Sequence, residues 1–159
     1  LMTLFVETIA KEVPDLNKNN IQLQFIGDLS TLPPHASAAL AQATADTASN
    51  TGLKLIIALS YSSRWEITSA VKQIAIDVQA GSLDPQQITQ DTIADYLCTK
   101  GIPDPALVIR TSGEFRISNF LLYQLAYAEL YFTPILWPDF RKPDLYQSKF
   151  FRFWRCNYS

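Results

Sequence analysis

The chain has 159 residues, of which 48% are hydrophobic and 18% are charged, and its formal net charge is −2. This composition is typical of one folded domain with an apolar core rather than of a disordered chain. No basic excess is present, so a nucleic-acid partner is not expected. With one histidine and two cysteines, the sequence also excludes a zinc cluster of Cys and His ligands.

The first sixty residues predict helices alternating with strands. Apolar residues at helical spacing predict a helix over residues 1–13 that ends at Pro14. Strict alternation predicts a strand over Ile21–Phe25, and an alanine-rich run predicts a helix over residues 36–48. The apolar run 53–59 predicts a central strand of a parallel sheet that is covered on both faces.

The rest of the chain continues this alternation. Its expected elements are, in order, a helix from the capping-box spacing Ser63–Glu66 to Gly81, one or two short helices over 84–97, a buried strand over 106–109, a polar loop over 110–118, a helix over 119–128, a strand over 130–132 and a helical tail from Asp144. This order indicates an α/β fold with a mainly parallel central sheet flanked by helices. No repeat or linker divides the sequence, so we expect a single domain over residues 1–159.

The segment that follows the second buried strand carries the best candidate site. Open α/β sheets bind their ligands at the carboxyl ends of their strands. Arg110 and Arg116 offer guanidinium groups that suit phosphate oxygens, and Ser118 begins the expected helix, whose N-terminus favours anions. The segment therefore predicts a site for phosphate or diphosphate. The alternative is a solvated loop in which the arginines pair with Glu114 and Asp104 and the serine is an ordinary helix cap.

Glu129 is a second candidate, because it interrupts an apolar run. A carboxylate is costly to bury unless it is paired or binds a cation. Mg²⁺ takes carboxylate oxygens together with phosphate oxygens, which makes Glu129 a candidate ligand for this ion. The alternative is a partly exposed glutamate or one paired with an arginine.

These segments resemble a known family. The sequence Ile109–Leu122, continued by residues 124–132 and 136–140, resembles the signature of the cis-prenyltransferases. The block Ala58–Ile67 resembles another part of the same family. The likeness spans roughly Leu1–Tyr146, and a match of this length is far more specific than a short motif.

The resemblance implies an enzyme that condenses isopentenyl diphosphate with farnesyl diphosphate, forming cis double bonds, to make the undecaprenyl diphosphate lipid carrier of cell-wall synthesis. It implies the undecaprenyl diphosphate synthase-like fold, a homodimer and a requirement for Mg²⁺. It assigns the diphosphate of isopentenyl diphosphate to Arg110, Arg116, Ile117 and Ser118, and it assigns Mg²⁺ to Glu129. Four of these residues, all except the isoleucine, are the expected catalytic residues.

The resemblance also implies an apolar tunnel for the growing chain. The helix that carries Leu1, Leu4 and Phe5 would line the tunnel, and Ile21 and Leu53 would lie deeper in it. An ordinary hydrophobic core is the alternative, because core and tunnel linings look identical in sequence.

The sequence departs from the family in several places. The family's Asp-Gly-Asn-Gly-Arg block, with its catalytic aspartate, is absent, and the chain starts at Leu1 rather than at a methionine. We therefore expect an incomplete domain that is inactive on its own. Phe115 stands where some members have a histidine, and residues 147–159 form an atypical tail in place of an arginine-rich ending.

The sequence also predicts a location and offers an alternative role. Two cysteines do not make a disulfide scaffold and no signal-peptide pattern is visible, so the cytoplasm is the expected compartment. The aromatic and basic residues of the tail could contact a membrane surface, although a helix end packed on the domain is the alternative. A different class of function is a non-catalytic homologue that binds lipid or partners a catalytic subunit.

Overall fold

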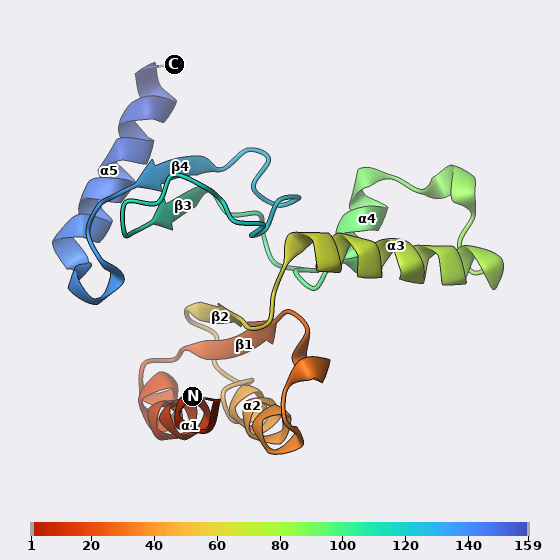
Figure 1. Cartoon of the computed structure of the whole chain (residues 1–159), viewed down its shortest axis with the longest axis horizontal. Coiled ribbons are helices and arrows are strands. Elements are labelled where there is room, and N and C mark those ends of the chain that lie inside the picture. Colours follow the sequence, from red (N-terminus) through yellow and green to blue (C-terminus); the bar gives the residue numbers. More distant parts are fainter. Residues whose placement is uncertain (1, 159) are drawn as a thin grey trace. The chain divides into compact units, whose positions relative to one another are not determined.

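The computed structural model describes residues 2–158, and it describes side chains for residues 4–150. The chain forms two compact units, Leu1–Lys100 and Gly101–Ser159. Figure 1 labels the helices and strands of both units. Short 3-10 helices lie in the connections at Leu29–Thr31, Pro85–Gln87 and Trp137–Asp139.

The first unit is built on two parallel strands, β1 (Gln22–Ile26) and β2 (Lys54–Ala58). The helices α1 (Met2–Lys18) and α2 (Pro34–Asp46) pack against each other and against β1. Figure 1 shows both helices on the same side of the strand pair. The core cluster of this layer consists of Leu32, Ala36 and Leu40, with Phe5, Val6, Ile9, Phe25, Leu29 and Leu59 packed against it.

The burial of β2 rises along the strand, from exposed residues at its start to half-buried Ile56–Ala58 at its end. Leu53, just before the strand, is 66% exposed, and Leu55 is 38% exposed. The expected cover on both faces is therefore limited to the second half of the strand. The physical reason is that α2, which supplies much of the cover, packs chiefly on β1 and α1.

Two further helices, α3 (Ser63–Gln79) and α4 (Gln90–Tyr96), complete the first unit and lie side by side. The cap of α3 is Ser62, whose side chain accepts a hydrogen bond from the backbone N–H of Trp65. The cap thus lies one residue earlier than the sequence predicted. Glu66, the expected partner in the capping box, is instead buried, with 2% of its surface exposed.

The helix α1 continues to Lys18, whereas the sequence predicted an end at Pro14. A proline inside a helix removes one backbone hydrogen bond. The apolar face nevertheless continues past the proline, since Val13 and Leu16 are half-buried at helical spacing from Ile9. Packing of this face against α2 outweighs the local cost.

The second unit contains the parallel pair β3 (Leu107–Arg110) and β4 (Glu129–Phe132). The C-terminal helix α5 (Lys142–Tyr158) contacts both strands, and Figure 1 shows it beside them. Each unit thus combines parallel strands with helices, which confirms the predicted α/β fold. Among the residues that the structure describes, no helix has both the length and the hydropathy needed to cross a bilayer.

Residues 119–128 form a series of turns, whereas the sequence predicted a helix. Ser118, Asn119 and Leu121 have φ angles of 54°, 61° and 46°. This left-handed backbone cannot enter a right-handed helix directly. The predicted helix N-terminus is therefore not available to an anion at this site.

Candidate diphosphate-binding site

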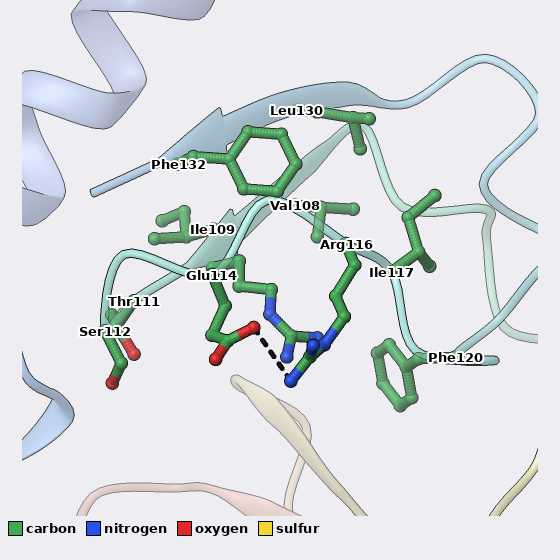
Figure 2. A pocket seen from close by; sticks show the side chains of 11 residues that line it. Val108, Ile109, Thr111, Ser112, Glu114, Arg116, Ile117, Phe120, Leu130 and Phe132 are labelled. Atoms are coloured by element: carbon green, nitrogen blue, oxygen red, sulfur yellow. Dashed lines mark ion pairs between the residues drawn. The ribbon is translucent and has the colours of Figure 1, made fainter. Parts of the chain in front are cut away.

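A cavity of about 450 Å³ opens on the β3–β4 pair and on the loop that follows β3. One part of its lining is apolar and the other is charged or polar (Figure 2). The apolar lining consists of Val108, Ile109, Ile117, Phe120, Leu130 and Phe132, and the polar lining consists of Arg110, Thr111, Ser112, Glu114 and Arg116. A cavity of this composition suits a small ligand that has an anionic head and a short apolar body.

Backbone hydrogen bonds hold the loop after β3 against the segment that follows β4. The N–H of Ser112 donates to the carbonyl of Ile135 at 2.8 Å, and the N–H of Gly113 donates to that of Thr133 at 2.9 Å. The N–H of Thr133 donates in turn to the carbonyl of Arg110 at 2.9 Å. The pairing of the two segments thus continues beyond the strands, and it fixes the loop where the polar lining begins.

An ion pair lies within the polar lining. Arg116 Nη2 is 2.9 Å from Glu114 Oε2, and Figure 2 shows the two side chains turned toward each other. This is one of the pairings that the solvated-loop alternative predicted. Because both partners line the cavity, the pairing and an anion site are compatible. Together with Arg110, the three charges sum to one net positive charge.

The structure brings together three of the residues that the resemblance assigned to the diphosphate. Arg110, Arg116 and Ile117 line the cavity, whereas Ser118 is exposed and lies outside its lining. Glu129 is half-buried at the first position of β4. In the strand register it lies at the opposite end of the pair from Arg110.

Apart from Ile117, the apolar lining was not predicted as part of the site. Leu130 and Phe132 alternate along β4, so both side chains reach the same face of the strand pair. Phe115, at the position where some family members have a histidine, is 81% exposed. Its ring centroid lies 5.5 Å from that of Phe132, at an interplanar angle of 40°. The period of two in the strand sequence is the signal that could have revealed this wall.

The predicted tunnel residues differ in their surroundings. Phe5 packs against the core cluster of the first unit. Ile21 is half-buried, while Leu4 and Leu53 are 64% and 66% exposed. Leu1 lies outside the described residues. The tunnel therefore remains a prediction.

A second polar cluster, which the sequence did not predict, lies in the first unit. Buried Glu66 accepts hydrogen bonds from the Tyr61 hydroxyl, from the Cys98 N–H at 3.0 Å and from the Cys98 thiol at 2.8 Å. Burial, reinforced by the hydrogen bond to Glu66, raises the pKa of the Cys98 thiol to about 12. Burial also raises the pKa of Tyr61, again with help from Glu66. Both groups thus remain protonated donors at neutral pH.

The residues partly fit a magnesium site. Within the part of the chain that the structure describes, no three or more His, Cys, Asp or Glu side chains gather as metal ligands. Mg²⁺ is commonly held by one or two carboxylates together with phosphate oxygens of a substrate. Glu129 could supply one carboxylate, so the donor chemistry fits Mg²⁺ jointly with a phosphate ligand.

Known proteins resemble this chain over most of its length. The family model described as "Putative undecaprenyl diphosphate synthase" matches residues 1–154. An isoprenyl transferase of Porphyromonas gingivalis is 54% identical over 140 residues, which are 88% of this chain and 55% of that protein. An isoprenyl transferase of Chlorobaculum tepidum is 46% identical over 148 residues, which are 93% of this chain and 56% of that protein. The chain thus spans little more than half the length of these relatives.

Solved structures show the same likeness. The crystal structure of lavandulyl diphosphate synthase from Lavandula x intermedia, in complex with dimethylallyl diphosphate, has a TM-score of 0.91 at 36% identity. The match covers 95% of this chain and 66% of the synthase chain. The structure of a probable undecaprenyl diphosphate synthase from Campylobacter jejuni has a TM-score of 0.80 at 28% identity. The match covers 95% of this chain and 68% of the Campylobacter jejuni chain. The chain therefore belongs to the undecaprenyl diphosphate synthase family of prenyltransferases.

Proposed function

We propose that a protein carrying this chain is a cis-prenyltransferase, which condenses isopentenyl diphosphate with farnesyl diphosphate to make an undecaprenyl diphosphate lipid carrier for cell-wall synthesis. The observation that carries the proposal is the cavity of the second unit, where Arg110 and Arg116 lie beside an apolar wall. Relatives named isoprenyl transferase support the activity, and a structural neighbour in complex with dimethylallyl diphosphate supports a prenyl diphosphate as ligand.

The two arginines bind the diphosphate of isopentenyl diphosphate through charge-assisted hydrogen bonds. Ile117 and the other residues of the apolar lining hold the five-carbon chain, and Ser118 adds a hydroxyl contact at the edge of the site. Bound in this way, the alkene is presented in one orientation to the allylic substrate. The carbon–oxygen bond of the allylic diphosphate breaks, a carbon–carbon bond forms with the alkene, and loss of a proton generates the new double bond.

Glu129 is the residue of this chain that would hold Mg²⁺, together with phosphate oxygens of the leaving allylic diphosphate. When bound, the ion supplies neutralisation of the diphosphate charge. This role is separate from that of the arginines, because Glu129 lies at the other end of the strand pair.

Further parts of the proposal concern the whole protein. The 159 residues lack the Asp-Gly-Asn-Gly-Arg block, and we propose that they do not catalyse transfer by themselves. The protein acts as a homodimer in the cytoplasm, with peripheral contact to the membrane that receives its lipid product. Leu4, Phe5, Ile21 and Leu53 belong to the tunnel for the growing chain.

Substitution of Arg116 tests the proposal in the full-length gene product. We expect Arg116→Ala to raise the KM for isopentenyl diphosphate by about ten- to hundredfold, the usual worth of hydrogen bonds to charged groups. The KM of Arg116→Lys should lie between that of the wild type and that of Arg116→Ala, because lysine keeps the positive charge but lacks the planar guanidinium group. Steady-state kinetics at saturating farnesyl diphosphate measure both.

Asp104→Asn is the matched control, since Asp104 is exposed in the second unit and lies outside the cavity lining. It should leave the KM unchanged. An unchanged KM in Arg116→Ala would remove the assigned role of this residue. A wild-type protein that binds prenyl diphosphates and transfers nothing would favour the non-catalytic homologue.

A further inference from the structure

We infer that Glu114 competes with the substrate diphosphate for Arg116, so that this glutamate lowers the affinity of the cavity for its anionic ligand. The inference rests on the proposed function and adds a residue that limits binding at the same site. In the absence of ligand the carboxylate takes the place that a phosphate oxygen would take on the guanidinium.

The geometry supports competition rather than separate roles. Glu114 Oε2 and Arg116 Nη2 are 2.9 Å apart, which is the separation of a charge-assisted hydrogen bond. Both residues line the cavity, so the carboxylate occupies a donor that faces the ligand space. Figure 2 shows the pair beneath the apolar wall formed by Phe132 and its neighbours.

The exposure of the pair makes displacement feasible. The Arg116 side chain is 70% exposed and that of Glu114 is 41% exposed. An ion pair in such a position is weak, because water screens the charges and both side chains must be ordered. A diphosphate carries more negative charge than one carboxylate and also meets Arg110 in the same cavity. The ligand therefore displaces Glu114, and the displaced carboxylate can rotate toward the solvent.

The pairing has two consequences for the site. Without ligand, Glu114 offsets the repulsion between two guanidinium groups that line one cavity. With ligand, the displaced carboxylate stays close by and favours release of the diphosphate. Glu114 thus stabilises the cavity without ligand and destabilises the bound diphosphate, and both effects lower the affinity.

Calorimetric titration of the full chain with inorganic diphosphate, at low salt and with a chelator of divalent cations, tests the inference. We expect Glu114→Gln to bind diphosphate about two- to fivefold more tightly than the wild type, which is the strength of an exposed ion pair. Asp104→Asn removes the same charge outside the cavity lining and should bind as the wild type does. Equal or weaker binding by Glu114→Gln would overturn the inference.

A double-substitution cycle shows whether the effect passes through Arg116. In an Arg116→Ala background, Glu114→Gln should no longer tighten binding, because the donor over which the two anions compete is gone. Full tightening in that background would contradict competition and indicate a general charge effect.

The same series separates this inference from the proposed function. If Arg116→Ala weakens diphosphate binding but Glu114→Gln does not tighten it, only the competitor role of Glu114 fails. If Arg116→Ala leaves binding unchanged, the diphosphate site itself is wrong and both proposals fail.

Discussion

Glu66 is a buried carboxylate whose hydrogen-bond donors come from two distant parts of the first unit. Tyr61 lies just before α3, and Cys98 lies 32 residues beyond Glu66, in the segment after α4. A buried carboxylate is tolerated only when its oxygens are satisfied, and these donors satisfy it. The cluster therefore ties the end of the first unit to the start of α3.

The raised pKa of Cys98 gives a direct test of this cluster. In a Cys156→Ser background, where Cys98 is the only thiol, we expect alkylation by iodoacetamide at pH 8.5 to be at least about tenfold slower than that of a free cysteine. Its rate should keep rising toward the pKa of about 12. Alkylation rates between pH 8 and 11 measure the shift, and the unfolded chain in urea is the control. A midpoint near pH 9 would show that Glu66 does not hold the protonated thiol.

The same shift determines how stability depends on pH. The ordinary pKa of this thiol is 9.0 and its pKa in the folded chain is about 12. Between these values the unfolded chain loses the proton while the folded chain keeps it. The free energy of unfolding should thus fall as pH rises from 9 toward 12, and it should fall less steeply in Cys98→Ser. Urea midpoints at pH 8.5 and 10.5 measure this difference.

At the level of residues, the sequence predicted what depends on local spacing. Arg110 ends the half-buried strand β3, Arg116 and Ile117 lie in the loop after it, and the structure places all three in one cavity. The roles of Glu66 and Cys98 could not be predicted, because their partnership arises only when segments far apart in sequence pack together.

At the level of elements, Gly27 shows how closely the chain packs where β1 and β2 end. Its φ angle is 111°, and a Cβ atom on it would lie 2.0 Å from the carbonyl oxygen of Leu59. A side chain at this position must therefore strain its own backbone and push the neighbouring segment away.

We predict that Gly27→Ala lowers the free energy of unfolding by about 3 kcal/mol or more, because backbone strain and overpacking add. Gly81→Ala is the matched control, since its φ angle is 73° and, beyond its chain neighbours, no atom of the described residues lies within 4 Å of its Cβ position. It should cost only about 1–2 kcal/mol, the strain of a left-handed alanine. Urea denaturation compares the two, and equal losses would contradict the close contact at Gly27.

Element boundaries followed from sequence where propensity and packing agree. The strands β1, β3 and β4 appear close to their predicted positions. Tertiary packing overrode the local signal at Pro14, where α1 continues. Over residues 119–128 the helical pattern was misleading, because the left-handed residues at its start, Ser118, Asn119 and Leu121, carry no glycine signal.

At the level of the whole molecule, each unit contains a parallel strand pair, which α1 and α2 contact in the first unit and α5 contacts in the second. The family match covers residues 1–154, so it includes residues of both units. The candidate diphosphate site is contained in the second unit alone. Because the chain spans 55% of its Porphyromonas gingivalis relative, the complete reaction is a property to be measured on the full-length gene product.

Product analysis of that gene product tests the central claim most directly. The full-length protein is incubated with farnesyl diphosphate, labelled isopentenyl diphosphate and Mg²⁺, and the product is examined by mass spectrometry and NMR. We predict a long polyprenyl diphosphate whose newly formed double bonds are cis. Absence of transfer, or new double bonds that are all trans, would contradict the claim.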